Sequence, residues 1–453
     1  MSSKYQKSVR VWLPLCAITL EVIFIVIFFF FTSYSASVDE QKKLLRDYRA
    51  FQDVFIMATF GFGFLNTSLR RHCWSSIAFN LFLLVLGVQL AALLDGFLTQ
   101  LSLRKMVIDM SSIQRATMIA TSVLISAGVV LGKVNLLQLV IMTLIEVTAF
   151  SATRLVSISY LDMNMHVSMM YMHMFAAYFG LTVVCCLRKP LPSASEDKDQ
   201  TATSPSLFTM LGTLFLWIFW PSFNSALLEL ADERKMAVFN TYYALAVSTV
   251  TGILMSALAH PQGKINMTHI HKAVLAGGVA VGAPSYLIHA PWLAMVLGCV
   301  AGMISIGGFR YLQACLQRKV QLHDTYGVHY TFGLPGLLGG IVNIMLMALQ
   351  AQGVDKSTLG YKVLIDLGAL AFTIIMGVAS GLLTGLLLNL NIWKSTHKIH
   401  YFDDQSFWKV ISQMMLRLAF SPSRPRYRPL GGHRSSLIAD LGIQLSRTIF
   451  SAG

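Results

Sequence analysis

The chain has 453 residues, of which 55% are hydrophobic and only 12% are charged, and its mean hydropathy is +0.62. A soluble domain carries roughly 25% charged residues, so this chain cannot cover a water-facing surface and needs a lipid bilayer as its main solvent. The net charge of +14 does not indicate a nucleic-acid partner. The basic residues fall in short segments between apolar runs and in the C-terminal tail, which is the positive-inside pattern of membrane proteins, and no nucleic-acid-binding motif accompanies them.

The N-terminus resembles a signal peptide at first sight. Lys4, Lys7 and Arg10 precede an apolar stretch that runs from Trp12 to Phe31. A stretch of about 20 residues is long enough to span a bilayer and longer than the apolar core of a secretory signal. We therefore expect an uncleaved first transmembrane helix.

Apolar segments of spanning length recur along the chain as far as Asn391. They predict an all-α, polytopic membrane bundle of about twelve helices. An even number of spans places both termini on one side of the membrane, and the basic N-terminus and tail predict that this side is the cytoplasm. The expected spans are 12–32, 53–70, 77–99, 113–132, 136–155, 168–187, 207–228, 236–259, 269–288, 292–312, 329–350 and 360–390.

Three polar features lie on the predicted cytoplasmic side. The segment 188–206 is rich in Pro, Ser and charge and reads as a flexible loop. Two glycosylation sequons, at Asn66 and Asn266, fall on the same side, so we expect neither to carry an N-glycan. The sequence thus divides into a transmembrane domain, 1–390, and a basic tail, 391–453, whose prolines predict disorder and whose arginines favour the anionic inner leaflet.

Cys186, beside Cys185, ends a helix just before Arg188. This placement is typical of a palmitoylation site, although two small packing residues explain it equally well. The six cysteines of the chain lack paired metal-ligand spacing. We also find no P-loop, nucleophile elbow or paired-glycine dinucleotide motif. The sequence therefore predicts neither an enzyme nor a cofactor.

Ionisable side chains inside a span cost about 2.5–3.5 kcal/mol each on insertion scales, so each one needs a reason. Glu21, Glu146 and Asp366 lie within spans and could line a proton or cation pathway. They could instead be buried, hydrogen-bonded carboxylates that hold helices together, and we favour this structural interpretation. His289, near Pro291, is expected at a solvated helix edge.

Several segments are similar to the ammonium-transporter/Rhesus superfamily. They are HMFAAYFGL from His173, DTYGVHYTFGLPG from Asp324, VLISAGVVLGK at 123–133, WPSFNSA at 220–226, NTYYALA at 240–246 and YFDDQSFW at 401–408. Within the superfamily, the phrase DKDQTAT at 197–203 resembles the blood-group Rhesus polypeptides rather than their glycosylated relatives.

The resemblance implies two inverted repeats and a pore within each subunit of a trimer. Two histidines face each other in such a pore, and an aspartate precedes each by eight residues. In this chain the first repeat has Met165 and His173, and the second has Asp324 and Phe332. Each repeat therefore keeps a different half of the pattern. His329 does not replace the missing imidazole, because a shift of three helical residues moves it one turn away and rotates it by about 60°.

The family's pore is also closed by two stacked phenylalanines. Phe223 matches one of them, and Met118 stands at the other position. Methionine is flexible and apolar, so it could still close the entrance.

The resemblance implies a multi-pass subunit of the Rhesus complex in the erythrocyte plasma membrane. Its implied partners are the Rh-associated glycoprotein, in a homo- or hetero-trimer, and the membrane skeleton (ankyrin), reached through cytoplasmic segments. In this interpretation the glycosylated partner carries the transport chemistry, and the present chain supplies structure, assembly and antigenic surface. The alternative is a functional ammonia, ammonium or carbon dioxide channel with altered pore chemistry, for which His173 and Asp324 speak.

Overall fold

The computed structural model describes residues 11–34, 40–69, 72–99, 106–187, 203–313, 315, 319, 324–351, 355–393, 402, 404, 407 and 408. The chain divides into two compact units, Met1–Phe407 and Trp408–Gly453, and the first of these is described below. The predicted disorder of the tail beyond 408, and of residues 188–202 in the predicted 188–206 loop, concerns positions outside the described residues; the last residues of that loop, 203–206, belong to a helix instead. The domain boundary at 390 stays a prediction.

The described residues of the first half of the bundle form helices and one two-stranded sheet. Its elements are α1 (Leu13–Phe31), β1 (Thr32–Tyr34), α2 (Glu40–Ile56), the π-helical η2 (Met57–Phe62), α3 (Gly63–Leu65), α4 (Trp74–Thr99), β2 (Met106–Ile108), α5 (Met110–Val130), α6 (Leu136–Ser159), α7 (Met165–Met170) and α8 (Met172–Leu187). Strands β1 and β2 pair in parallel, with Thr32 opposite Met106.

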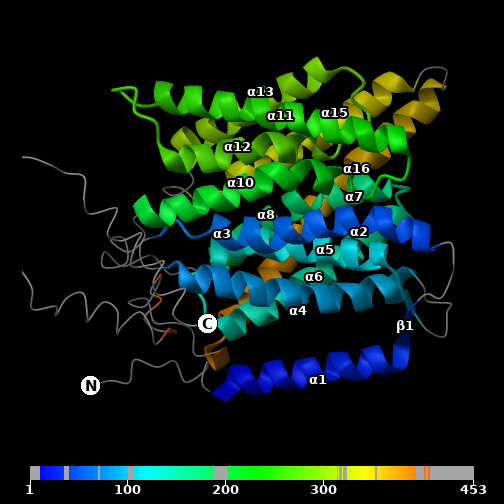
Figure 1. Ribbon diagram of the computed structural model, residues 1–453, viewed down its shortest axis with the longest axis vertical. Helices are drawn as coiled ribbons and strands as arrows, with labels where there is room; N and C mark the ends of the chain where they lie inside the picture. Colours follow the sequence, from blue (N-terminus) through cyan, green and yellow to red (C-terminus); the bar gives the residue numbers. More distant parts are fainter. Residues whose placement is uncertain are drawn as a thin grey trace, which may run out of the picture. The chain divides into compact units, whose positions relative to one another are not determined.

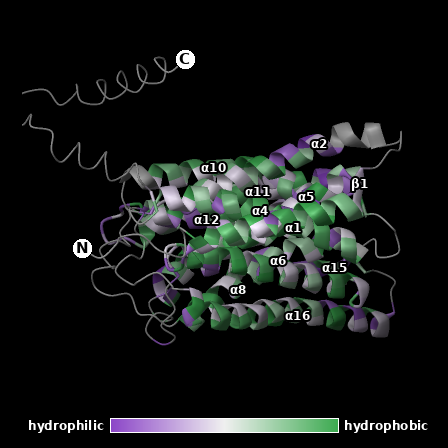
Figure 2. Ribbon diagram, turned by 90° about the horizontal axis from the view of Figure 1, so that it is seen from below, coloured by the Kyte–Doolittle hydropathy of each residue, from purple (hydrophilic) through white to green (hydrophobic). Residues whose placement is uncertain are grey.

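The regular elements in the described residues of the second half are all helical. Its elements are α10 (Thr203–Ser225), α11 (Ala231–Leu258), α12 (Met267–Gly282), α13 (Pro291–Gly307), η3 (Gly308–Leu312), η4 (His329–Gly333), α15 (Leu334–Gln350), α16 (Lys356–Leu388) and the 3₁₀ turn η5 (Asn391–Trp393). The helices run side by side and roughly parallel, with α1 at one edge (Figure 1). Hydrophobic residues cover the lengths of the helices in Figure 2.

Ten helices of the described part are long and apolar enough to cross a membrane, and the expected helical membrane bundle is thus confirmed. The other two expected spans, 53–70 and 269–288, correspond to α2–η2–α3 and to α12. The first starts in a charged stretch and the second has only 16 residues, so the total of twelve spans stays a prediction. The helix over 40–52 was not predicted, although its Glu, Gln, Lys, Leu and Arg residues are good helix formers.

Small residues let the backbones of neighbouring helices approach closely. A Cβ atom added to Gly298 of α13 would lie 2.3 Å from the carbonyl oxygen of Ala244 in α11, and one added to Gly277 of α12 would lie 2.5 Å from the same oxygen. Gly339 of α15 approaches the carbonyl of Ala280 in the same way, at 2.3 Å. In lipid, where apolar burial does not drive helix association, such contacts hold the bundle together.

An ion pair shows the relative direction of the two repeats. Lys362 Nζ lies 3.4 Å from Asp162 Oδ2, so the beginning of α16 lies at the same end of the bundle as the residues that precede α7 and α8. Because α15 ends just before α16 begins, α15 and α8 run in opposite directions. This arrangement agrees with the inverted repeats expected from the sequence.

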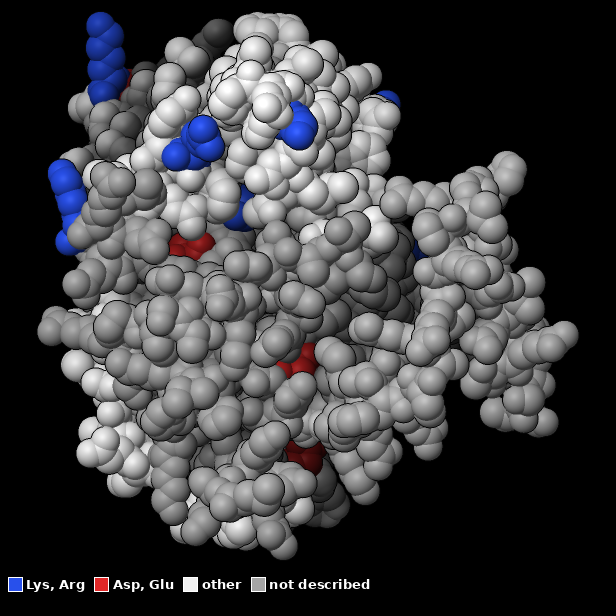
Figure 3. Space-filling view, turned by 90° about the vertical axis from the view of Figure 1, so that its left-hand side faces the viewer, with Lys and Arg blue, Asp and Glu red and all other residues white. Residues whose placement is uncertain are grey.

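Asp404 lies at the end of the bundle opposite to the Lys362–Asp162 ion pair, and we call this the Asp404 end. The Asp404 carboxylate accepts hydrogen bonds from the backbone N–H groups of Cys73 (2.9 Å), Trp74 (2.8 Å) and Ser75 (3.2 Å). It thereby caps the N-terminus of α4 from more than 300 residues away in sequence. Burial and the Asp404 charge raise the pKa of Cys73 to about 11, so this thiol stays protonated at neutral pH. Figure 3 looks onto the Asp404 end, where blue Lys and Arg side chains stand out on the described surface.

Phe402 anchors the same segment. Its side chain is fully buried, it packs against Leu69, and its N–H donates to the carbonyl of Gly132 at 3.0 Å. Gly132 has φ +82°, and a Cβ atom there would lie 2.3 Å from the Phe402 ring. Only glycine fits this position, because it tolerates positive φ and leaves room for the ring.

Candidate functional site

An aromatic cluster surrounds His173, the first residue of the HMFAAYFGL segment on α8. The His173 ring lies parallel to Phe332 of η4, with 6.2 Å between ring centroids and an interplanar angle of 1°. Trp220 and Phe223 of α10 complete the cluster, with centroids 5.8 and 6.0 Å from the imidazole. All four side chains are at most 2% exposed. The structure thus brings three residues predicted for the pore into contact, His173, Phe332 and Phe223, and adds Trp220.

Hydrogen bonding assigns the tautomer of His173. Its Nδ1 atom lies 2.9 Å from the carbonyl oxygen of Met170, and a carbonyl can only accept, so the proton resides on Nδ1. The Nε2 atom is then an acceptor, and it has no hydrogen-bond partner among the described residues. His173 therefore presents an unsatisfied lone pair inside an otherwise aromatic cluster.

Phe332 separates His173 from the Asp404 end of the bundle. Its ring also stacks on Phe62 of η2, at a centroid distance of 5.9 Å. A phenyl ring fills the space of an imidazole but neither donates nor accepts a conventional hydrogen bond. The parallel pair can pack, yet it cannot pass a proton between its members.

The two positions eight residues earlier have different environments. Asp324 is 3% exposed, and its carboxylate accepts from the backbone N–H groups of Val328 (3.0 Å) and His329 (2.9 Å). It therefore caps the beginning of η4. Met165 is 44% exposed at the start of α7, where the Asn164 side chain accepts from the His166 N–H at 2.8 Å. Asn164, which sequence reasoning missed, supplies the cap in the first repeat.

Two other predicted residues lie outside the ring contacts of His173. Met118 is fully buried on α5 but is not among the ring and hydrogen-bond neighbours of His173 in the described part of the chain. His329 points its ring edge at Tyr178 of α8, with 5.8 Å between centroids. Its place beside Tyr178 is consistent with the prediction that His329 does not replace the missing imidazole.

The remaining ionisable candidates have mostly structural surroundings. Glu146 is fully buried and accepts from the Ser126 hydroxyl at 2.5 Å, which links α6 to α5. Glu21 accepts from the Gln89 amide at 3.3 Å and so joins α1 to α4. Asp366 is 8% exposed on α16, and His289 is exposed as expected. These hydrogen bonds favour the interpretation that Glu21 and Glu146 hold helices together.

Sequence reasoning missed several buried ionisable residues. Asp95 of α4 pairs with Arg115 of α5 at 2.9 Å and approaches Arg154 of α6 at 3.7 Å. His166 bonds the carbonyl of Gly282 at 3.0 Å. Lys272 is 5% exposed on α12. All of these residues lie inside or beside expected spans, so considering every ionisable residue of each apolar run would have found them.

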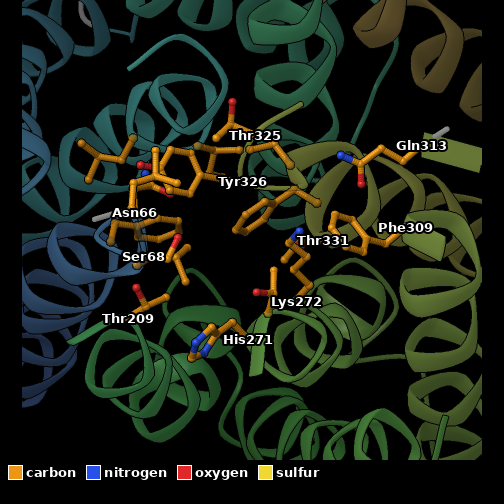
Figure 4. A pocket seen from close by; sticks show the side chains of 18 of the residues that line it. Asn66, Ser68, Thr209, His271, Lys272, Phe309, Gln313, Thr325, Tyr326 and Thr331 are labelled. Atoms are coloured by element: carbon orange, nitrogen blue, oxygen red, sulfur yellow. The ribbon is translucent and has the colours of Figure 1, made fainter. Parts of the chain in front are cut away.

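A cavity of about 540 Å³ lies below Phe332 toward the Asp404 end. Its walls come from the η2–α4 turn, α10, α12, η3 and the turn before η4, and its polar side chains surround an open centre (Figure 4). The polar lining residues are Asn66, Ser68, Thr209, Asn266, Thr268, His271, Lys272, Gln313, Thr325, Tyr326 and Thr331. This cavity was not predicted from the sequence. Both sequon asparagines, Asn66 and Asn266, line it.

Cys186 packs inward at the end of α8. A Cβ atom added to Gly385 of α16 would lie 3.0 Å from the Cys186 sulfur, so this thiol occupies the seam between two helices. Palmitoylation there stays a prediction. Among the described residues, no group of three or more His, Cys, Asp or Glu side chains could hold a metal ion.

Comparison with known proteins places this chain in a family. The model of the Ammonium Transporter Family matches residues 12–405. The RH-like protein IC of Gorilla gorilla gorilla is 60% identical over 409 residues, which cover 90% of this chain and 98% of that protein. The Blood group Rh(D) polypeptide of Homo sapiens is 58% identical over the same shares.

Solved structures share the fold. Rh50 of Nitrosomonas europaea, from the Rhesus protein family of channels, superposes with a TM-score of 0.71 at 26% identity, over 89% of this chain and 99% of that chain. A sensor Amt protein superposes with a TM-score of 0.62 at 18% identity, over 79% and 96%. The chain therefore belongs to the ammonium transporter family, whose members are channels and transporters rather than enzymes.

Proposed function

We propose that this chain is a structural and antigenic subunit of an Rh complex in the erythrocyte plasma membrane, and that its own pore passes ammonium poorly. One observation carries the second part of this proposal. The His173 imidazole faces the Phe332 ring at 6.2 Å, where the family pattern has a second imidazole.

The physical consequence concerns the proton. Two facing imidazoles can hydrogen-bond and relay a proton between them, whereas His173 and Phe332 cannot. With Met165 at the aspartate position, the first repeat also lacks a carboxylate there. The field of such a carboxylate would favour a cation in surroundings of low dielectric constant. Both changes raise the barrier for a charged or proton-coupled substrate.

The proposed assembly rests on the family to which the chain belongs. The Rh polypeptides to which this chain is 57–60% identical support an Rh complex as its setting. We propose a trimer, formed with the Rh-associated glycoprotein or with further copies of this chain, that meets the membrane skeleton (ankyrin) through cytoplasmic segments. The glycosylated partner then carries most of the transport.

A second candidate function is a channel for neutral ammonia or carbon dioxide. The observation that favours it is the unpartnered Nε2 acceptor of His173. A passing ammonia molecule could donate a hydrogen bond to this atom without needing a proton relay.

Flux measurements separate the two candidates. Proteoliposomes that contain this chain alone should take up methylammonium at close to the rate of protein-free liposomes, with a glycosylated relative as the positive control. Ammonia entry, followed by internal pH, should likewise stay near the protein-free rate. Methylammonium uptake at the relative's rate would contradict the impaired pore, and rapid ammonia entry alone would favour the second candidate.

Surface expression tests the assembly. A subunit whose helix faces are built to pack against a partner should reach the plasma membrane poorly in cells without the Rh-associated glycoprotein, and several times better when that protein is co-expressed. Flow cytometry with an antibody to an external loop measures this ratio. Equal surface levels in both cell lines would count against the structural-subunit proposal.

Topology gives a further prediction. Both termini and the 188–206 loop should lie in the cytoplasm, and Asn66 and Asn266 should carry no glycan. Asn66 is 3% exposed in the cavity wall, which supports its inaccessibility. An antibody to the tail should bind only permeabilised cells, and glycosidase should leave electrophoretic mobility unchanged. Tail staining of intact cells would refute the assignment.

A further inference from the structure

Helix α1 has an unusually open surface. Only 6% of the residues in its apolar stretch are buried, against at least 33% in every other helix of spanning length in the described part of the chain. It lies at one edge of the bundle, and its main contacts are with α4 and β1 (Figure 1). Phe24 and its neighbours on one face pack against Leu86 and Leu93 of α4. The other faces of α1 are open to lipid or to a further helix.

A carboxyl group lies on the open side, in the middle of this helix. Glu21 is the ninth of the 19 residues of α1, and it is exposed. Its Oε2 atom accepts from Gln89 Nε2 of α4 at 3.3 Å, and this hydrogen bond is itself exposed. A carboxylate can accept about four hydrogen bonds, so one long bond leaves most of its capacity unused. Ionisable side chains at this depth almost always face other protein groups, and the surroundings of Glu21 in a single subunit are therefore incomplete.

The exposed apolar side chains beside Glu21 recur at the spacing of a coiled coil. They follow one another in alternating steps of three and four residues, and each is more than half exposed: Leu15, Ile18, Val22, Ile25 and Phe29. We call this set the α1 stripe. Glu21 comes three residues after Ile18 and four before Ile25, so its side chain points within about 60° of the stripe. In a coiled coil this is a flanking position, where charged residues determine the choice of partner.

We propose that the α1 stripe binds the transmembrane helix of a partner protein, and that this helix carries a lysine or arginine at the depth of Glu21. The apolar face of the partner would pack on the stripe, and its cation would pair with the Glu21 carboxylate beside Gln89. Opposite charges attract most strongly where the dielectric constant is low, and a basic residue that is costly in lipid alone would find its counter-charge here. The contact does not depend on whether the pore conducts, because α1 contributes no residue to the aromatic cluster around His173.

The test measures energy transfer between the full chain and synthetic helices in phosphatidylcholine liposomes. The chain carries a donor fluorophore at its C-terminus, and each peptide carries an acceptor. Three peptides share one leucine-rich spanning sequence and differ at the central residue, which is Lys, Leu or Glu. The Lys peptide should bind about tenfold more tightly than the Leu peptide, as expected for one strong polar contact between helices in a membrane. The Glu peptide should show no such preference, because its carboxyl group would face that of Glu21.

Five variants locate the contact. Glu21→Leu should abolish the preference for the Lys peptide, and Glu21→Gln should reduce it several-fold. Glu21→Lys should reverse it, so that the Glu peptide binds most tightly; a carboxyl group that only joined α1 to α4 would give no such exchange. Ile25→Ala should weaken the binding of all three peptides. Leu383→Ala is the matched control, because Leu383 is exposed on α16 to a similar extent, 56% against 60% for Ile25, and it should leave binding unchanged.

Three outcomes would overturn the proposal. The first is equal binding of the Lys and Leu peptides to the parent chain, and the second is a Lys preference that survives Glu21→Leu. The third is energy transfer between differently labelled copies of the parent that disappears in Glu21→Leu, since a second copy of this chain would then cover the stripe. If Glu21→Lys does not insert, the peptide series on the parent and on Glu21→Gln decides the question, and an unchanged Lys preference in Glu21→Gln would reject the charge pair.

Discussion

Changing Met165 to Asp and Phe332 to His together should raise methylammonium uptake by about tenfold or more over the parent chain, and above the sum of the two single changes. The double variant restores an aspartate and a histidine in each repeat. The new imidazole would take the place of the Phe332 ring beside His173, and its N–H could donate to the unpartnered Nε2 atom of His173. A hydrogen bond to a charged group contributes about 1.5–3 kcal/mol, and each 1.36 kcal/mol in a barrier is a factor of about ten in rate.

The single variants should do less for separate reasons. Phe332→His supplies the imidazole pair without the outer carboxylate, and Met165→Asp adds a charge beside an unchanged aromatic cluster. Phe332→Leu is the matched control, because it removes the ring without adding a hydrogen-bonding group. Uptake is measured with radiolabelled methylammonium in proteoliposomes after the variants are shown to assemble. A double variant that assembles normally and stays silent would contradict the prediction, and Phe223 or Met118 would then be the next residues to change.

Replacing Gly298 by Val should strongly destabilise the bundle. A Cβ atom at this position would lie 2.3 Å from the Ala244 carbonyl oxygen, so α13 must move away from α11 to admit the side chain. Overpacking typically costs about 1–3 kcal/mol, and the value here should reach or exceed the upper end, because a backbone atom cannot turn aside. The expected readout is a lower unfolding temperature in detergent and a lower yield of folded protein.

The same helix offers a control for this change. A Cβ atom added to Gly307 would meet no neighbouring atom within 4 Å, so Gly307→Val makes the same change in helix propensity without a clash. The difference between the two variants measures the close approach of α13 to α11. Equal unfolding temperatures for Gly298→Val and Gly307→Val would show that the contact is not rigid.

The helical bundle was predictable because each span has to satisfy its backbone within itself and show apolar side chains to lipid. Length and hydropathy therefore locate helices such as α4 and α16 to within a few residues. The same criterion fails for most of α2, because its polar stretch 40–52 extends the helix beyond the apolar run. An apolar run in the sequence indicates which part of a helix lies in lipid. It does not indicate the residues at which the helix begins and ends.

The candidate site was predictable only as far as the repeats reach. The resemblance to the family identified His173 and Phe332 as facing positions, and the structure places their rings side by side. Asp324 caps the beginning of η4, and Asn164 caps the beginning of α7 in the first repeat. Both roles depend on local backbone directions that a single sequence does not reveal. Lys272 and His271 escaped notice because the walls of their cavity come from segments between residues 62 and 332, whose proximity is a tertiary property.

The segment around Phe402 and Asp404 has a practical consequence for handling the protein. A chain that is truncated after Trp393 would lose the carboxylate that holds three N–H groups at the start of α4, and it would empty the space that the Phe402 ring fills beside Gly132. Fluorescent fusions and affinity tags that replace the C-terminus therefore belong after Trp408. A tag inserted between Trp393 and Phe402 would loosen the seating of this short segment and, with it, the turn that leads into α4.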